Sequence, residues 1–299
     1  MQTDDRQHKL AYAYAAVAVL FWATAASAFK LSLRHVGVQP LLCIASVSST
    51  VVFFIYLVAT GKLRLLRTFT RKDYLWSAGL GLLNPFLYYV ILFKAYSLLP
   101  AQEAQPINFV WPLTLVLLSI PLLGQRIKLV SILAIVISFT GVVIIATRPE
   151  TPSDIFRFRF SNARGVFLAL STTIIWSLFW IYNTKDRCDE AVRLFMNFTF
   201  ASVYILALML VTGQAAIPDW AGLLGGIYIG LFEMGVTFLA WLKAMRNAKT
   251  TAHVVSLIYL VPFLSLLLIA LVVGETIRLS TVIGLVLIVT GIIVQKLTG

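Results

Sequence analysis

Long apolar segments follow one another along almost the whole chain, and short polar stretches separate them. Each segment runs for roughly 17–25 residues, the length that an α-helix needs to cross the hydrocarbon layer of a membrane. Runs that are continuously apolar over this length differ from the alternating strands of a membrane β-barrel. The pattern therefore predicts an all-α integral membrane protein with ten transmembrane helices. They span approximately residues 10–29, 39–60, 74–97, 101–122, 127–147, 164–183, 191–212, 219–243, 250–272 and 278–295.

The sequence repeats itself with a shift of 150 positions. Under this shift, prolines and glycines of one half meet identical residues in the other: Pro112 meets Pro262, Gly124 meets Gly274, and Gly141 meets Gly291. Each of these residue types serves a particular backbone need, so matches at them indicate a shared architecture. The chain is therefore predicted to be an internal duplication. Residues 1–150 form the first five-helix repeat, helices 1–5, and residues 151–299 form the second, helices 6–10.

Five helices in each repeat make the second repeat enter the membrane from the face opposite to the first. The two repeats are then related by a pseudo-two-fold axis in the membrane plane. Such inverted-topology repeats are typical of secondary transporters, which bind their substrate near the bilayer midplane at the repeat interface. We therefore expect two inverted halves around a central cavity.

Composition agrees with a membrane protein. The chain is 60% hydrophobic and 12% charged, and its mean hydropathy is +0.92, whereas a soluble protein is about 25% charged. We attribute the net charge of +12 to loop lysines and arginines that face anionic membrane lipids. Nucleic acid is not an expected partner, because tracts of mixed basic and aromatic residues are missing. Roughly two thirds of the 24 basic side chains fall on the side of both termini, which predicts cytoplasmic N- and C-termini.

The sequence contains little that favours catalysis or a cofactor. The two cysteines and three histidines are scattered, so neither a disulfide nor a metal site is expected. An intramembrane enzyme needs a nucleophile with a base, or clustered carboxylates and histidines, at mid-depth. A channel should carry rings of charge or filter loops. Neither pattern is visible, so we expect no catalytic residue, no metal and no cofactor, and a carrier is favoured over both alternatives.

A carboxyl group in the middle of the predicted eighth helix is the first candidate for a functional residue. A shift of 149 positions places Asn84 of helix 3 on Glu233 of helix 8, so both are expected near the bilayer midplane. A charged residue there costs roughly 2.5–3.5 kcal/mol on insertion scales, so it is a functional candidate by default. Glu233 is interpreted as a site for a proton or a substrate amine. The alternative is a protonated carboxyl that only bonds a neighbouring helix.

Helix 4 carries Gln105, Asn108 and Pro112 at spacings that place them on one helical face. Pro112 removes a backbone donor, and the carbonyl freed in this way must face protein or a wet cavity. Pro112 and its counterpart Pro262 are therefore candidate hinge or gating residues. In helix 9, Ser256 and Tyr259 share a face before Pro262. The alternative is that Asn108 only joins helices and that the prolines only kink them.

Aromatic side chains in the middle of segments are the remaining candidates for substrate binding. Tyr88 lies one turn after Asn84 on the same face. A cavity walled by rings would stack an aromatic or flat cationic substrate, at about 0.5–1.5 kcal/mol for each good pair. The alternative for each ring is a lipid-facing or packed core position. The mid-segment candidates are Trp22, Tyr88, Trp111, Trp176, Trp180 and Phe238.

The chain resembles the EamA-type branch of the drug/metabolite transporter superfamily. The resemblance rests on ten helices in two halves, on Pro112 and Pro262 inside helices 4 and 9, and on Gly274-Glu275 before the last helix. It covers nearly the whole chain, although the first half carries Gly124-Gln125 instead. The stretch Asn108-Phe109-Val110-Trp111-Pro112 is similar to the Asn-aromatic-x-Trp-Pro stretch of bacterial aromatic amino-acid exporters.

This resemblance implies a multi-pass secondary transporter of a bacterial-type inner membrane, working by alternating access. It would export aromatic amino acids, together with other amino acids or drugs, from the cytoplasm. The alternative within the superfamily is an exporter of drugs or other metabolites. Coupling to protons stays open, because Glu233 is the single carboxyl in the middle of a predicted helix.

Overall fold

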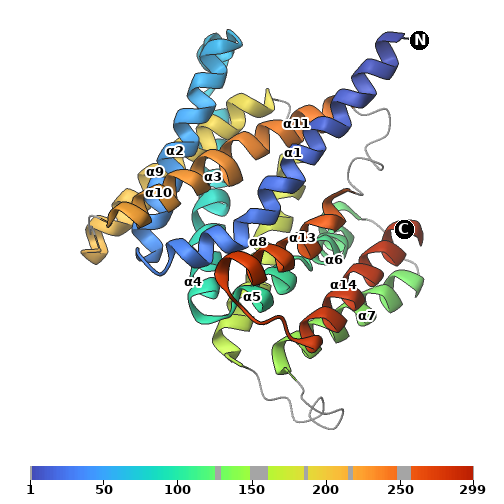
Figure 1. Cartoon of the computed structure of the whole chain (residues 1–299). Coiled ribbons are helices and arrows are strands. Elements are labelled where there is room, and N and C mark those ends of the chain that lie inside the picture. The colour runs from blue at the N-terminus through green and yellow to red at the C-terminus, as the bar shows by residue number, and fades with distance from the viewer. Residues whose placement is uncertain are drawn as a thin grey trace. The chain divides into compact units, whose positions relative to one another are not determined.

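The computed structural model describes residues 2–124, 129–148, 161–184, 188–214, 218–247 and 257–298, and it contains no strand within these ranges. Its helices group into two compact units (Figure 1). Unit 1 comprises Met1–Val90 and Asp186–Leu268, and unit 2 comprises Ile91–Lys185 and Ile269–Gly299. Each unit takes helices from both halves of the sequence. This grouping reflects spatial contact, so the predicted repeat boundary at residue 150 stays a prediction.

Unit 1 is built from helices that flank two wider, π-helical segments. Its elements are α1 (Gln2–Ser32), α2 (Val38–Ala59), the 3₁₀ helix η1 (Lys62–Thr68), α3 (Arg71–Gly81), the π-helical η2 (Leu82–Leu87), the start of α4 (Tyr88–Leu98), α9 (Glu190–Thr212), α10 (Trp220–Tyr228), the π-helical η4 (Ile229–Val236), α11 (Thr237–Asn247), the 3₁₀ helix η5 (Leu257–Leu260) and α13 (Val261–Leu268).

Unit 2 holds the remaining helices. They are the rest of α4, then α5 (Ala101–Asn108), α6 (Trp111–Leu123), α7 (Leu129–Thr147), α8 (Ala163–Thr184), the π-helical η6 (Ile269–Val273) and α14 (Leu279–Thr298). Seven spans of the described chain are long and apolar enough to cross a membrane, and three apolar helices are shorter, Ile132–Thr147, Leu257–Val273 and Leu279–Val294. The all-helical prediction is confirmed for the described residues. The count of ten transmembrane helices stays a prediction, because it requires the three shorter helices to span as well.

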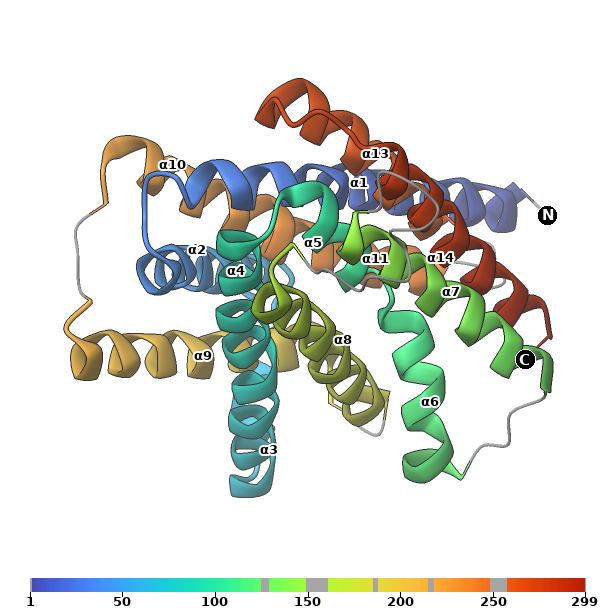
Figure 2. The same ribbon diagram turned by 90° about the horizontal axis from the view of Figure 1, so that it is seen from below.

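In unit 2, α7 and α14 pack antiparallel along their length (Figure 2). The Ser138 hydroxyl donates to the Ile288 carbonyl at 3.0 Å, and the shift of 150 positions pairs these two residues. A β-carbon at Gly141 would overlap the carbonyl oxygen of Gly284, and one at Gly291 would overlap that of Ala134. The shift of 150 positions pairs Gly141 with Gly291 and Ala134 with Gly284, so each contact is the counterpart of the other. Small residues therefore let the two backbones approach closely in a self-complementary pair.

In unit 1, α2 and α9 form a second antiparallel pair. Residue numbers rise along α2 as they fall along α9 in three contacts: Gln39 with Thr212, Thr50 with Ser202, and Phe53 with Phe198. Each helix ends at a glycine with a left-handed backbone, Gly61 at φ 65° and Gly213 at φ 64°. Glycine tolerates this conformation because it has no β-carbon. The two terminating glycines and the Thr50–Ser202 contact share one shift of 152 positions.

Predicted helix 4 is interrupted, which corrects the expectation of one continuous helical face. α5 ends at Asn108, and α6 begins at Trp111 with Pro112 as its second residue. Proline fits the first turn of a helix, where its missing N–H has no intrahelical partner to lose. Pro262 is likewise the second residue of α13. Gln105 and Asn108 therefore share a short helix, whereas Pro112 belongs to the next one.

Ionic contacts join the loops at one end of unit 1. Lys62 Nζ lies 2.6 Å from Asp189 Oδ2. Partial burial raises the pKa of the Asp189 carboxyl, but hydrogen bonds from Lys62 and from two backbone amides outweigh it and hold this pKa below its usual value. Arg193 is 2% exposed and donates to the Ser77 hydroxyl at 2.6 Å. Its guanidinium also lies 3.7 Å from Asp73 Oδ1. Arg193 thus packs inside the unit. This differs from the expectation that basic side chains between the apolar segments face lipid headgroups.

Candidate functional site

A buried carboxyl–phenol contact lies in the centre of unit 1. Glu233 is 7% exposed and Tyr89 is fully buried. The Tyr89 hydroxyl lies 2.8 Å from Glu233 Oε1 and 3.0 Å from Oε2, and donates to this carboxyl group. The Tyr89 ring meets Phe29 of α1 edge-on, with centroids 6.4 Å apart. Glu233 therefore has a polar partner on α4 inside an otherwise apolar setting, which is the condition under which a buried carboxyl can be tolerated.

Glu233 and Asn84 both lie where an α-helix widens into a π-helical segment. Glu233 is part of η4 and Asn84 is part of η2, so the shift of 149 pairs two positions that both depart from a regular α-helix. Asn84 precedes Pro85 and has non-helical angles, φ −144° and ψ 124°. The proline ring disfavours helical angles in the preceding residue, which explains this break. π-helical insertions of this kind often occur at functional sites.

Asn84 is completely buried, and neither its amide oxygen nor its amide nitrogen has a hydrogen-bond partner among the described residues. An unsatisfied buried amide costs about 1–3 kcal/mol. Such an amide is also free to bond a ligand through both its donor and its acceptor atoms. These two properties make Asn84 a stronger candidate for substrate binding than its position in the sequence alone.

The other predicted residues of unit 1 have different surroundings. The Trp22 ring packs against Trp241 with centroids 5.4 Å apart and against Phe238 at 6.3 Å. Phe238 and Tyr88 are buried, and the Tyr88 ring meets that of Tyr89 edge-on at 4.8 Å. The residue that reaches Glu233 is thus Tyr89, one position after the predicted Tyr88. Tyr259 is half-buried in η5, and Ser256 lies outside the described residues.

In unit 2, a polar contact joins α5 to α8. Asn108 Nδ2 donates to the Thr172 hydroxyl at 2.8 Å. One helix further, the Thr114 and Thr173 hydroxyls lie 2.9 Å apart. Gln105 is 8% exposed, and its side-chain oxygen has no hydrogen-bond donor within the described part of the chain. Asn108 therefore joins two helices, as its structural interpretation proposed, while Gln105 keeps an acceptor available.

Three of the predicted tryptophans form one cluster between α6 and α8. The Trp111 and Trp176 rings meet at 71° with centroids 6.4 Å apart, and Trp180 lies 5.9 Å from Trp176. Ser177 Oγ donates to the Trp111 carbonyl at 3.1 Å, which fixes the start of α6 against α8. Trp180 is half-buried, and its indole N–H has no acceptor among the described residues. The cluster thus offers ring surface together with an available donor.

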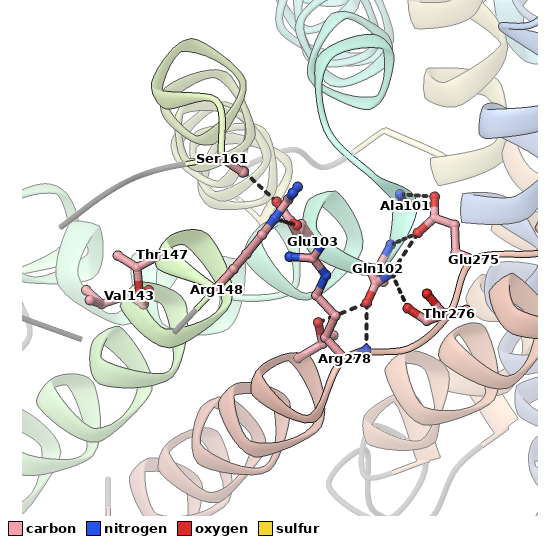
Figure 3. Close-up of polar contacts among 11 residues, drawn as sticks. Ala101, Gln102, Glu103, Val143, Thr147, Arg148, Ser161, Glu275, Thr276 and Arg278 are labelled. Carbon is pink, nitrogen blue, oxygen red and sulfur yellow. Dashed lines mark hydrogen bonds and ion pairs between the residues drawn. The ribbon is translucent and has the colours of Figure 1, made fainter. Parts of the chain in front are cut away.

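Glu275, the acidic residue of the Gly274-Glu275 pair, caps the first turn of α5 (Figure 3). Its two carboxylate oxygens accept from the backbone amides of Ala101 at 2.8 Å and Gln102 at 3.1 Å. A carboxylate at a helix N-terminus satisfies amides that lack partners and complements the helix dipole. The Gln102 side-chain oxygen accepts in turn from the Arg278 amide at 3.0 Å. The pair thereby fixes the loop before α14 to α5, whereas Gln125 lies outside the described residues.

Sequence reasoning missed a second buried carboxyl, Glu103. It is 1% exposed, forms an ion pair with Arg148, and accepts a hydrogen bond from Ser161 Oγ at 2.7 Å. Figure 3 shows Arg148 reaching towards Glu103 from the end of α7. Glu103 stands near the start of an apolar segment, where a charged side chain usually reaches the membrane surface. The signal in the sequence that could have suggested its burial is Arg148, a basic residue at the end of a different apolar segment.

Comparison with known proteins gives a family match over most of the chain. The model of the EamA-like transporter family matches residues 9–147 and 163–295. The uncharacterized transporter YvbV of Bacillus subtilis is 26% identical over 272 residues, which cover 90% of this chain and 83% of that protein. An uncharacterized transporter of Clostridium kluyveri is 30% identical over 182 residues, which cover 58% of this chain and 56% of that protein.

The aromatic amino acid exporter YddG of Ancylobacter novellus is 26% identical over 196 residues, which cover 64% of this chain and 65% of that protein. The chain thus matches between about half and two thirds of the length of two of these three relatives. A solved structure with 22% sequence identity has a TM-score of 0.68 and covers 97% of both chains. At this identity the likeness concerns the fold alone.

Proposed function

The chain belongs to the EamA-like transporter family, and we propose that it exports aromatic amino acids across a bacterial-type inner membrane. The alternative within the family is an exporter of drugs or other metabolites. The observation that carries this proposal is the Trp111–Trp176–Trp180 cluster of unit 2. Its rings provide a surface for an aromatic side chain, and the Trp180 indole N–H is available for a carboxylate or carbonyl oxygen. Similarity to an aromatic amino acid exporter supports the same substrate class.

Each unit contains polar groups that could bind a substrate. In unit 2 the Gln105 oxygen has no donor among the described residues, and unit 1 holds Asn84 and Glu233. Glu233 is the proposed acceptor for an ammonium group or a proton. Whether transport is coupled to protons depends on this residue.

The proposed mechanism is alternating access by two inverted five-helix repeats with cytoplasmic termini. Antiparallel pairing of α2 with α9 and of α7 with α14 supports an inverted relation, because each pair joins sequence-equivalent helices. Two further features recur at equivalent positions: the π-helical segments η2 and η4, and the left-handed glycines Gly124 and Gly274. The two stretches matched by the family model also coincide with the predicted halves.

Replacement of Trp180 tests the role of the tryptophan cluster. Trp180→Ala is expected to raise the KM for phenylalanine by about 2–13-fold, because one aromatic pair contributes about 0.5–1.5 kcal/mol. Trp220→Ala is the matched control, since this tryptophan is 73% exposed on α10. Initial rates of labelled substrate flux would be measured in proteoliposomes. If KM changed equally in both variants, the tryptophan cluster would have no specific role in substrate binding.

Competition assays separate the proposed substrates from the alternative within the family. Unlabelled tryptophan and tyrosine should reduce phenylalanine flux, whereas glutamate should not. A carrier for drugs or other metabolites would instead transport a labelled cationic amphipathic compound. Unlabelled compounds of that kind would reduce this flux, and aromatic amino acids would leave it unchanged. Saturation and counterflow would distinguish either carrier from a channel.

A further inference from the structure

Lys243 of α11 is held between two tyrosines from other helices of unit 1. Its ammonium nitrogen lies 5.3 Å from the ring centre of Tyr14 on α1 and 5.4 Å from that of Tyr56 on α2. All three side chains are half-buried. A cation over an aromatic face is attracted by the negative charge density of the ring, and each such contact is worth about 0.5–2 kcal/mol, depending on solvation. The position of the ammonium group is therefore fixed by three helices.

The three residues lie at one face of the membrane. Tyr14 is four residues into the apolar span Leu10–Ser32, Tyr56 is three residues before the end of Val38–Ala59, and Lys243 is two residues before the end of Trp220–Met245. In the proposed topology this face is cytoplasmic, because it also carries the N-terminus. An exported substrate would approach the protein from this side.

Among the described residues, Lys243 contacts rings and not a carboxylate. In the described part of the chain it makes no ion pair with a carboxylate, whereas Lys62 is paired with Asp189 and Arg193 with Asp73. Tyrosine rings stabilise an ammonium group but carry no opposite charge. An ammonium group near a low-dielectric region attracts anionic groups more strongly than one in bulk water. The chemistry thus points to an anion such as a carboxylate as the missing partner.

Aromatic side chains continue from Lys243 along the same pair of helices. Trp241 is two positions before it and packs with Trp22 of α1, which also contacts Phe238. Residues two apart do not face each other on a helix, so these rings belong to the same pair of helices as Lys243 but not to its immediate surroundings. Lys243 and Glu233 are ten residues apart on one helical rod, or about 15 Å. The carboxylate and the ammonium of an α-amino acid share one carbon atom, so a single molecule cannot bind both residues at once.

We propose that Lys243, held by Tyr14 and Tyr56, binds the substrate carboxylate at a cytoplasmic entry site separate from the Glu233 region. This inference deepens the proposed function and rests on it for the identity of the substrate. Lys243 thereby selects carboxylate-bearing substrates from neutral or purely cationic ones. The competing source of an anionic group is the phosphate of a lipid headgroup, to which a lysine near a helix end can extend.

The test compares phenylalanine with phenylalaninamide, in which a neutral amide replaces the carboxylate while the ring and the ammonium group stay. Lys243→Gln should raise the KM for phenylalanine by about tenfold, which corresponds to about 1.4 kcal/mol, and change that for the amide by less than about twofold. Lys243→Arg should restore most of the difference, because guanidinium also pairs with carboxylate. Lys94→Gln is the matched control, because Lys94 is the sequence-equivalent lysine and is exposed.

The outcomes separate this inference from the proposed function. Equal loss for phenylalanine and its amide in Lys243→Gln would overturn the inference and indicate a lipid-binding or structural lysine, while the exporter function would stand. Binding of phenylpropionate to the purified protein, measured by calorimetry, gives a readout that needs no transport. Binding that is lost in Lys243→Gln but retained in Lys94→Gln would support the carboxylate site even if no phenylalanine flux were found. Binding that is unchanged in Lys243→Gln would refute it.

Discussion

Removal of the Tyr89 hydroxyl tests whether the buried contact with Glu233 stabilises unit 1. Tyr89→Phe keeps the ring, which is fully buried, and deletes only the donor that lies 2.8 and 3.0 Å from the two carboxylate oxygens. The substitution therefore leaves the Glu233 carboxyl group without its hydrogen-bond donor and creates almost no cavity. Glu233→Leu is the complementary change, because it removes the acceptor of the contact while keeping a side chain of similar size.

The expected loss follows from the setting of the contact. Hydrogen bonds to charged groups contribute about 1.5–3 kcal/mol in soluble proteins. Hydrogen bonds between membrane helices average about 0.6 kcal/mol and reach about 1.7, because the unfolded state also finds partners in the membrane. The Tyr89 hydroxyl is close to both carboxyl oxygens and is fully buried, so we expect this contact to lie near the upper end of the range for membrane helices. We expect Tyr89→Phe to lower the free energy of unfolding by about 1–1.7 kcal/mol.

Unfolding by sodium dodecyl sulfate in mixed micelles would measure this loss for Tyr89→Phe, Glu233→Leu and the double variant. The double-mutant cycle should give a coupling of about 1 kcal/mol, because both residues take part in one contact. Phe93→Leu shows separately what loss of a buried ring on the same helix costs, and Tyr89→Phe should cost less because its ring stays. Effects of the two single changes that add within about 0.3 kcal/mol would refute the reasoning.

Two other changes test the remaining buried charges. Glu103→Gln removes a carboxylate that is paired with Arg148 and bonded to Ser161; it should destabilise the protein by about 3–5 kcal/mol in the same unfolding assay, because Arg148 loses its counter-charge. The double variant Glu103→Gln with Arg148→Gln should recover part of this loss, and no recovery would show that the pair does not act as a unit. Glu233→Gln should leave the protein folded but alter the pH dependence of transport, because the amide that replaces the carboxyl group does not titrate. An unchanged rate and pH profile would exclude Glu233 from proton or ammonium binding.

The apolar pattern predicted the helices well because lipid imposes length and continuity on every span. The segment 39–60 corresponds closely to α2, Val38–Ala59. Places where the regular helix changes were harder to predict. Segment 101–122 divides into α5 and α6, and segment 74–97 contains the π-helical η2. Prolines marked both breaks, but a proline at the first turn of a new helix and one inside a kinked helix look alike in a sequence.

Candidate residues were predicted best where a polar group stands alone in a long apolar run. Glu233 and Asn84 were identified in this way, and both are buried in π-helical segments. Their partners were not predictable, because a tyrosine such as Tyr89 differs from a packing ring only through the residue that its hydroxyl meets. Glu103 was missed because its position near a segment end suggested a surface location. Burial of Glu103 depends on Arg148, which is distant in the sequence.

Flux of labelled phenylalanine into proteoliposomes that hold the purified protein tests the proposed function most directly. The protein would be compared with empty liposomes, with and without an imposed pH gradient. The account predicts saturable flux that unlabelled tryptophan reduces and glutamate does not; if the flux responds to the gradient, Glu233→Gln should abolish that response. Flux equal to that of empty liposomes, in a preparation that still shows cooperative unfolding, would contradict export of aromatic amino acids.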